Sequence, residues 1–168
     1  YQPEDAGPIN DRRLWPFYEK AQELGIPLTL HTGVSYVCPQ PNSHCHPQQL
    51  DDVALAFPDL KMIAYHAGWP YTEELIGLCG KHKNLYMSLS GIFGCHAIGT
   101  ALQWVPADKI VLGFDLPFDD LPRVTDYIRD LSMPEELQEK WGYAQVTDED
   151  KAKILGLNLA KLTGIEPT

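Results

Sequence analysis

The sequence predicts an α/β fold of the (β/α)8 TIM-barrel type, and three observations support this prediction. Short apolar runs each end in a polar residue, and these polar residues are His31, His66, Ser90 and Asp115. The four positions are 35, 24 and 25 residues apart, which leaves room for a helix between parallel strands. The runs are apolar throughout, as expected for a parallel sheet that is covered on both faces. Four such units make half of a barrel, which typically takes about 250 residues.

The predicted order of elements is one helix followed by four units of strand and helix. The predicted strands are 26–30, 60–65, 85–89 and 110–114. An open, doubly wound sheet of four strands is the competing architecture. No Gly-x-Gly-x-x-Gly follows any of these strands, so a dinucleotide site has no support.

The predicted helices are bounded by recognisable start and stop residues. Asn10 is the expected N-cap of the first helix. Because Pro16 restricts the first turn, we expect the regular helix to begin near Trp15, and Gly25 is expected to end it. Gly80 ends a helix over 72–79. Further helices are expected over 47–57, in the second part of 92–104, over 120–131 and over 134–143. A capping box formed by Thr147 and Asp150 starts a last helix that runs to 162, before Gly164.

Composition describes an ordinary globular chain and excludes several function classes. The 168 residues are 44% hydrophobic and 21% charged, which fits a single domain over 1–168. The net charge of −10 argues against nucleic-acid binding. No apolar run approaches the roughly 20 residues that a membrane span needs. The four cysteines lack Cys-x-x-Cys spacing, so we expect free thiols and a cytoplasmic location. Because the chain starts at Tyr1 in a loop-like segment, we expect it to be the C-terminal part of a longer chain.

The polar residues at the strand ends are the candidate chemical groups. A single histidine in such a place is more often a packing residue than a ligand. Two histidines and one aspartate at the ends of successive strands are a more specific pattern. Imidazole nitrogens and carboxylate oxygens are ligands for zinc, manganese or iron. A histidine that does not bind the metal can transfer protons near neutral pH.

The order and spacing of five motifs resemble the C-terminal half of a known family. The motifs are His31-Thr-Gly, His66-Ala-Gly-x-Pro, Asn84-Leu-Tyr-Met-Ser, Lys109-Ile-Val-Leu-Gly-Phe-Asp-Leu-Pro-Phe and Gly156-Leu-Asn-Leu-Ala-Lys-Leu. They are similar to those of the amidohydrolase-related metal-dependent hydrolases, a group that includes decarboxylases, hydratases and lactonases. The resemblance implies that this chain supplies about strands 5–8 of the barrel and that a divalent metal, zinc or else manganese, is bound. It makes His31 and Asp115 metal ligands, with Asp115 also catalytic, and His66 the catalytic proton-transfer residue.

One departure from the resembled pattern leaves two further interpretations open. The family carries a His-x-His pair on its first strand, but the only such pair here is His44-Cys45-His46, in the loop over 32–47. The chain is therefore alternatively a catalytically incomplete half-barrel, either a fragment or a subunit completed by a partner. A relative that keeps the fold without a metal is the third interpretation.

The long loop after His31 also has two interpretations. Cys38, His44, Cys45 and His46 are possible zinc ligands, but their spacing matches no closed zinc motif. We favour a role for His44 and His46 in the wall of the substrate pocket or in a contact between subunits. Trp69 is either a pocket residue or a packing aromatic of the next helix.

Ser90 is a candidate hydrogen-bonding group for a ligand because it follows the third strand. Together these observations predict a metal-dependent hydrolase or non-oxidative decarboxylase. Its substrate would be a small molecule with a carboxylate or carbonyl group. We expect it to form a homo-oligomer or to be completed by an N-terminal half, with no nucleic-acid or membrane partner.

Overall fold

A computed structural model describes residues 7–36, 41–91 and 94–166, and these contain a four-stranded parallel sheet. Its strands are β1 (Leu28–Leu30), β2 (Met62–Ala64), β3 (Leu85–Ser88) and β4 (Ile110–Val111). Their order in the sheet is β1-β2-β3-β4, and each neighbouring pair is parallel. The predicted α/β class with a parallel sheet is confirmed. The order shows no reversal among these strands, whereas a doubly wound sheet reverses at its switch point.

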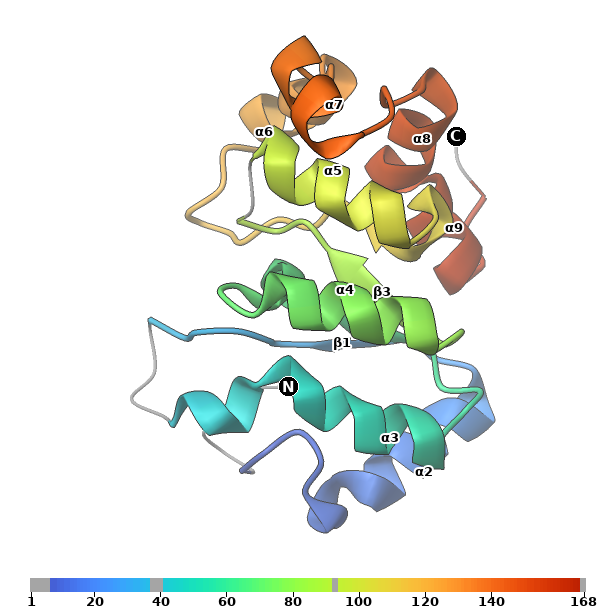
Figure 1. Cartoon of the computed structure of the whole chain (residues 1–168). Helices are drawn as coiled ribbons and strands as arrows, with labels where there is room; N and C mark the ends of the chain where they lie inside the picture. Colours follow the sequence, from blue (N-terminus) through green and yellow to red (C-terminus); the bar gives the residue numbers. More distant parts are fainter. Residues whose placement is uncertain (1–6, 37–40, 92–93, 167–168) are drawn as a thin grey trace.

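Helices follow each strand, and Figure 1 shows α3, α4 and α5 as a layer in front of the strands. The α-helices are α2 (Trp15–Leu24), α3 (Leu50–Ala56), α4 (Thr72–Lys81), α5 (Cys95–Trp104), α6 (Leu121–Arg129), α7 (Glu135–Trp141), α8 (Asp148–Ala152) and α9 (Asn158–Thr163). Short 3-10 turns are η1 (Arg12–Leu14), η2 (Asn42–Cys45), η3 (Pro47–Gln49), η4 (Tyr65–Gly68) and η5 (Ala107–Lys109), and η6 (Lys153–Leu157) is a π-helical segment. Among the described residues, no helix is long and apolar enough to cross a membrane.

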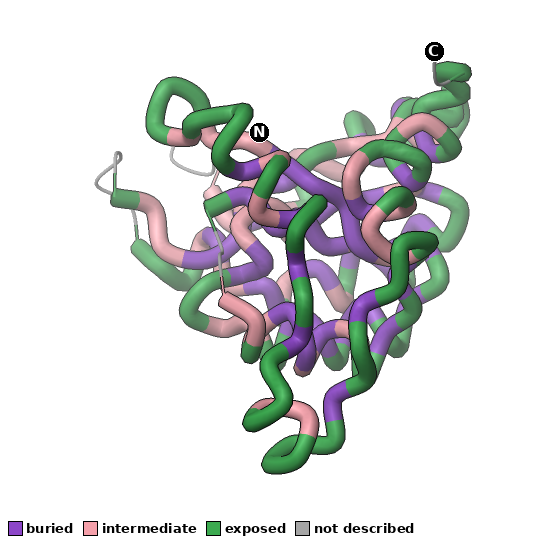
Figure 2. Tube along the Cα trace, turned by 90° about the horizontal axis from the view of Figure 1, so that it is seen from above, coloured by how far each residue is buried: buried purple, intermediate pink, exposed green. Residues whose placement is uncertain are grey.

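The two faces of the sheet are covered very differently. Met62, Ala64 and Met87 point toward the helices and belong to the large buried core, which lies at the centre of the view in Figure 2. Because side chains alternate along a strand, the residues between them point to the other face. There Ile63 and Val111 form a small cluster with Leu162 of α9.

The start of the first helix and the end of α4 differ from the prediction. Asp11, not Asn10, caps the first turn by accepting a 2.8 Å hydrogen bond from the Arg13 backbone N–H. The Asn10 amide instead donates to Asp52. The regular helix α2 begins at Trp15 and ends at Gly25, as predicted. Gly80 does not end α4, because it does not adopt the positive φ of a helix-terminating glycine, and the helix continues to Lys81.

The fourth strand is shorter than predicted, and the reason lies in the last helical region. The N–H of Leu112 donates to the carbonyl of Ile154, 2.9 Å away, so the chain leaves the sheet after Val111. Ile154 lies in the π segment, where backbone groups are released from the regular α-helical pattern. Asp115 therefore lies in a turn, four residues beyond the strand. The capping box of Thr147 and Asp150 is present.

Three cysteines lie in the described residues, and all three are free thiols. Cys45 and Cys79 are buried, and Cys95 is partly exposed. Burial raises the pKa of the Cys79 thiol to about 12. Cys38, one of the possible zinc ligands of the long loop, lies outside the described residues.

Candidate functional site

A cleft of about 680 Å3 lies at the C-terminal ends of the four strands. Each of the four strands is followed by a segment that contributes to its lining. The lining residues are His31, Val34, Tyr36, His66, Trp69, Thr72, Ser90, Gly91, Gly94, Ala97, Asp115 and Phe118. The four polar residues predicted from the strand ends thus meet in one cavity. Parallel strands place their C-terminal ends on the same side, which is why residues far apart in the sequence converge there.

The two histidines of the cleft contact each other edge to face. Their ring centroids are 4.9 Å apart, with an angle of 64° between the planes. His66 lies in η4 with φ +58°, and Ala67 follows with φ +45°. Residues other than glycine rarely adopt such positive φ values, and they do so mainly where the surrounding structure enforces them. The turn after β2 is therefore held in an unusual conformation at His66.

Hydrogen bonds join the loop after β1 to this strained turn. The buried Thr32 hydroxyl donates to the Tyr65 carbonyl at 2.5 Å, and the N–H of Val34 donates to the Trp69 carbonyl at 2.9 Å. Gly33 lies between them, and a Cβ atom there would be only 2.1 Å from the Trp69 carbonyl oxygen. Only glycine allows this close approach, which fixes the positions of both histidine-bearing loops.

Ser90 presents a buried hydroxyl to the cleft. Its side chain is 0% exposed, and its Oγ has no hydrogen-bond partner among the described residues. A buried hydroxyl without a partner costs free energy, so such a group in a cleft is suited to bind a ligand or a water molecule.

Asp115 is half-buried in a turn that Asp119 holds in place. The Asp119 carboxylate accepts a 2.5 Å hydrogen bond from the backbone N–H of Asp115. The N–H groups of Phe118 and Asp119 in turn donate to the Asp115 carbonyl. Asp119 is thus a positioning residue for the carboxylate in the cleft.

Aromatic side chains form the rim of the cleft. Tyr36 and Trp69 lie with ring centroids 6.1 Å apart, and Phe118 is 74% exposed. A polar floor with an apolar rim is the usual composition of a small-molecule site. Sequence reasoning missed Tyr36 and Phe118. Their signals were the long loop after His31 and the turn that follows Asp115.

His44 and His46, which we expected in the pocket wall, are not among the residues that line the cleft. His46 caps η3 by accepting from the Gln48 N–H, and its ring packs on Tyr71 with centroids 4.1 Å apart. Its Nε2 lies 3.6 Å from the Glu74 carboxylate. His44 lies in η2, the turn before it. These local contacts use His46 for packing and capping.

Comparison with known proteins identifies the family. The amidohydrolase family model matches residues 2–165. The chain belongs to the amidohydrolase family. A curated relative is the gamma-resorcylate decarboxylase of Polaromonas sp. (strain JS666 / ATCC BAA-500), which is 23% identical over 78% of this chain and 53% of its own length.

Solved structures of TIM-barrel proteins resemble this amidohydrolase chain. An uncharacterised TIM-barrel protein from Bordetella bronchiseptica matches with a TM-score of 0.75 and 26% identity over 94% of this chain and 52% of its own. A dihydroxybenzoic acid decarboxylase from Polaromonas sp. JS666, with bound manganese and the inhibitor 2-nitroresorcinol, matches with a TM-score of 0.70 and 18% identity. That match covers 96% of this chain and 57% of the decarboxylase. The chain thus spans about half the length of these relatives.

The amidohydrolase cleft contains metal-binding side-chain types without a complete set of ligands. Two imidazoles and one carboxylate line it, and these donors suit zinc or manganese. Within 7–36, 41–91 and 94–166, however, no three His, Cys, Asp or Glu side chains are grouped closely enough to hold a metal ion. The residues present therefore fit part of a metal site, and further ligands are needed to complete it.

Proposed function

We propose that this chain forms about strands 5–8 of a (β/α)8 barrel and carries the C-terminal half of a metal-dependent active site. The reaction we propose is hydrolysis or non-oxidative decarboxylation of a small carboxylate or carbonyl substrate. One observation carries the proposal: His31, His66 and Asp115 line a single cleft at the C-terminal ends of four parallel strands. The decarboxylase names of the relatives support this choice of reaction.

In this proposal His31 and Asp115 hold a divalent metal, zinc or manganese, together with ligands from an N-terminal half. Manganese is bound in the Polaromonas decarboxylase structure, which supports it as an alternative to zinc. Such a metal supplies Lewis-acid polarisation of a carbonyl or activation of water. The three free thiols of the described residues support a reducing compartment such as the cytoplasm.

The chain's own side chains have distinct proposed tasks. His66, next to His31, transfers a proton to or from the reacting carbon or water, as histidine is suited to do near neutral pH. Asp119 holds the turn that carries Asp115. The aromatic rim packs against the apolar part of the substrate and excludes water from the polar floor.

The alternative, a half-barrel that is inactive by itself, is favoured by the incomplete ligand group and by the open sheet. β1 and β4 are both edges, since each pairs with one strand only among the described residues. An N-terminal half or a second chain would then complete the barrel.

The test measures bound metal and turnover together in the complete protein. Intact mass establishes whether an N-terminal half is present, and elemental analysis gives the metal content. We expect His31→Ala and Asp115→Ala to lose both the metal and the decarboxylation or hydrolysis of a panel of hydroxybenzoates and lactones. Asp59→Ala, an exposed carboxylate on another part of the surface, is the control. Retention of metal by both variants would refute the proposed ligands. A metal-free but active protein would favour the metal-independent interpretation.

A further inference from the structure

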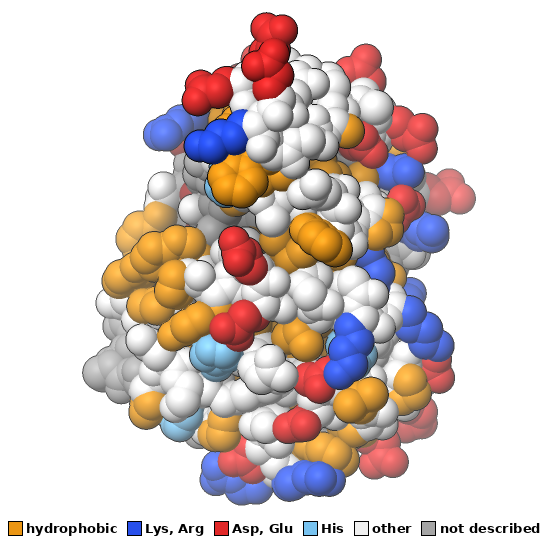
Figure 3. All heavy atoms as spheres, in the orientation of Figure 1, with side chains coloured by type: hydrophobic (Ala, Val, Ile, Leu, Met, Phe, Trp, Pro, Cys, Tyr) orange, Lys and Arg blue, Asp and Glu red, His pale blue; other side chains and the backbone are white. Residues whose placement is uncertain are grey.

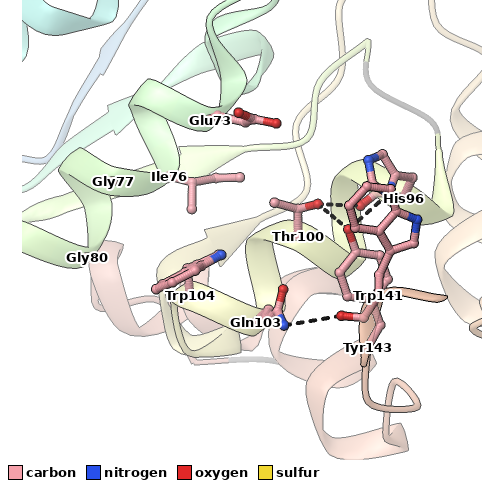
Figure 4. A pocket seen from close by; sticks show the side chains of 10 residues that line it. All are labelled: Glu73, Ile76, Gly77, Gly80, His96, Thr100, Gln103, Trp104, Trp141 and Tyr143. Carbon is pink, nitrogen blue, oxygen red and sulfur yellow. Dashed lines mark hydrogen bonds between the residues drawn. The ribbon is translucent and has the colours of Figure 1, made fainter. Parts of the chain in front are cut away.

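A second cavity of about 490 Å3 lies on the outer helical layer and shares no lining residue with the cleft. It lies between α4 and α5, and its far wall comes from the end of α7. In Figure 4 Trp104 lies toward one end of this groove, His96, Trp141 and Tyr143 lie toward the other, and Glu73 of α4 lies above them. We refer to these five residues as the aromatic groove.

One wall of the aromatic groove is fixed by hydrogen bonds. The Tyr143 hydroxyl lies 2.9 Å from His96 Nδ1 and 2.6 Å from the Thr100 hydroxyl. Tyr143 also packs flat on α5, where a Cβ atom at Gly99 would lie 2.4 Å from its ring. Tyr143 is only 5% exposed. This wall is therefore preformed, and binding there need not order it first.

Two large aromatic surfaces remain open beside this wall. Trp141 packs on His96 with ring centroids 5.0 Å apart and is still 47% exposed. Trp104 is 71% exposed. Exposed aromatic faces that flank a cavity are typical of a ligand site, because the faces of the rings are electron-rich and apolar.

The charged side chains around the aromatic groove favour a positively charged ligand. Glu73 is the acidic group of the lining, and no lysine or arginine lines the cavity within the described part of the chain. Figure 3 shows hydrophobic side chains and carboxylates over the middle of this face, with most lysines and arginines toward its edges. Lys140 Nζ lies 5.5 Å from the Trp141 ring centroid, so this ring can hold a cation, and a cationic ligand there would displace Lys140. An anionic ligand is disfavoured here, and a cationic one is attracted to both ring faces and carboxylate.

We propose that the aromatic groove binds an organic cation, an alkylated ammonium group on an apolar body. The aromatic faces of Trp104 and Trp141 would contact the alkyl groups, and Glu73 would neutralise the charge. This site is independent of the proposed barrel chemistry, since none of its residues belongs to the cleft.

The test is a titration of the full chain with choline, followed through the indole N–H signals in NMR spectra. The chain has four tryptophans. We expect the signals of Trp104 and Trp141 to shift on titration and those of Trp15 and Trp69 to stay in place. Trp69 lines the cleft and therefore reports binding at the other site. The matched uncharged probe is 3,3-dimethylbutan-1-ol, which has the shape of choline without its charge and should bind more weakly.

Two substitutions separate charge from stacking. Glu73→Gln should weaken choline binding about three- to fivefold, because it removes one exposed ion pair between the carboxylate and the ammonium group. Glu19→Gln, an equal charge change on α2, should leave it unchanged. Trp141→Ala should abolish the shifts at Trp104, whereas Phe17→Ala, the loss of another exposed aromatic, should not.

Three results would overturn the proposal. The first is equal binding of choline and the uncharged probe. The second is a shift confined to Trp69. The third is broadening with protein concentration that is confined to the Trp104 and Trp141 signals and spares those of Trp15 and Trp69, which would make the groove an interface between chains.

Discussion

At the scale of single residues, the cleft depends on a glycine that is not among its lining residues. Gly33 has φ +89°, and its missing Cβ leaves room for the Trp69 carbonyl. Its own N–H donates to the Cys45 carbonyl at 2.9 Å. Through these contacts the loop after His31 is packed directly on the loop after His66.

We therefore expect Gly33→Ala to destabilise the protein by about 2 kcal/mol or more, since it adds both backbone strain and a steric clash. Urea unfolding followed by circular dichroism measures this change. Gly77→Ala is the matched control. Gly77 lies in α4, and nothing is within 4 Å of its added Cβ, so this change should stabilise by about 0.5–1 kcal/mol. Equal stabilities of the two variants would show that the loops tolerate a larger separation.

His66 offers a substitution that separates chemistry from folding. Its φ of +58° is tolerated by asparagine better than by other residues with side chains. In the complete metal-loaded protein, His66→Asn should keep the fold and the metal while turnover falls about 100-fold or more, the usual contribution of a general acid or base. Elemental analysis measures the retained metal, and steady-state kinetics measures the loss of turnover. Unchanged turnover would show that His66 does not carry out the proposed proton transfer.

Strand direction is the main reason why sequence reasoning found the polar residues of the cleft. His31, Ser90 and Asp115 follow apolar runs, and parallel pairing brings them into one cavity. Tyr36 reaches the same cavity from a loop whose path depends on the glycine contact described above. The wrong prediction for His46 has the same kind of cause. Its ring packs on Tyr71, and no pattern in the sequence predicts this contact.

At the scale of elements, a carboxylate connects two neighbouring helices. Asp51 in the first turn of α3 lies 2.5 Å from Lys81 Nζ and 2.5 Å from His82 Nε2, at the end of α4. His82 is 7% exposed. The hydrogen bonds from Lys81 and His82 lower the pKa of Asp51. A buried imidazole thus has a charged partner that unfolding would remove.

We expect Asp51→Asn to destabilise the protein by about 1–3 kcal/mol at neutral pH, because it weakens the partner of a buried ring. The folded pKa of Asp51 is lowered, so its contribution is present above the unfolded value of about 4 and is lost as pH falls through the folded pKa. The difference between wild type and variant should therefore shrink below about pH 4. Urea unfolding across pH 2–7 tests this. Asp59→Asn, whose partner Lys83 is exposed, should show no such difference.

Element boundaries were predictable where local signals decide them. The capping box at Thr147 and the stop at Gly25 are local, and the structure has both. β4 was predicted too long because the N–H of Leu112, the residue after the strand, donates to the carbonyl of Ile154, far along the chain. The π segment that supplies this carbonyl has no sequence signature of its own.

At the scale of the whole molecule, the face of the sheet that carries Ile63 and Val111 is covered only in part by the described residues. Ile63 and Val111 pack with Leu162, whereas Thr29, the register partner of Ile63 on β1, is exposed. Relatives of this chain are about twice as long. In the proposed barrel, further strands would pair at both edges, and this face would line the closed interior.

An uncovered edge strand tends to pair with another chain, so a chain of 18.9 kDa that consists of these residues alone should self-associate. Size-exclusion chromatography with light scattering should show a dimer or a larger species at micromolar concentration. Thr29→Lys places a charge on the open face of β1 and should shift the population toward monomer. Ser43→Lys adds the same charge at an exposed position outside the sheet and should not. A monodisperse monomer in the unsubstituted chain would mean that the chain closes its own core, and the proposed completion by a second half would then be unnecessary for folding.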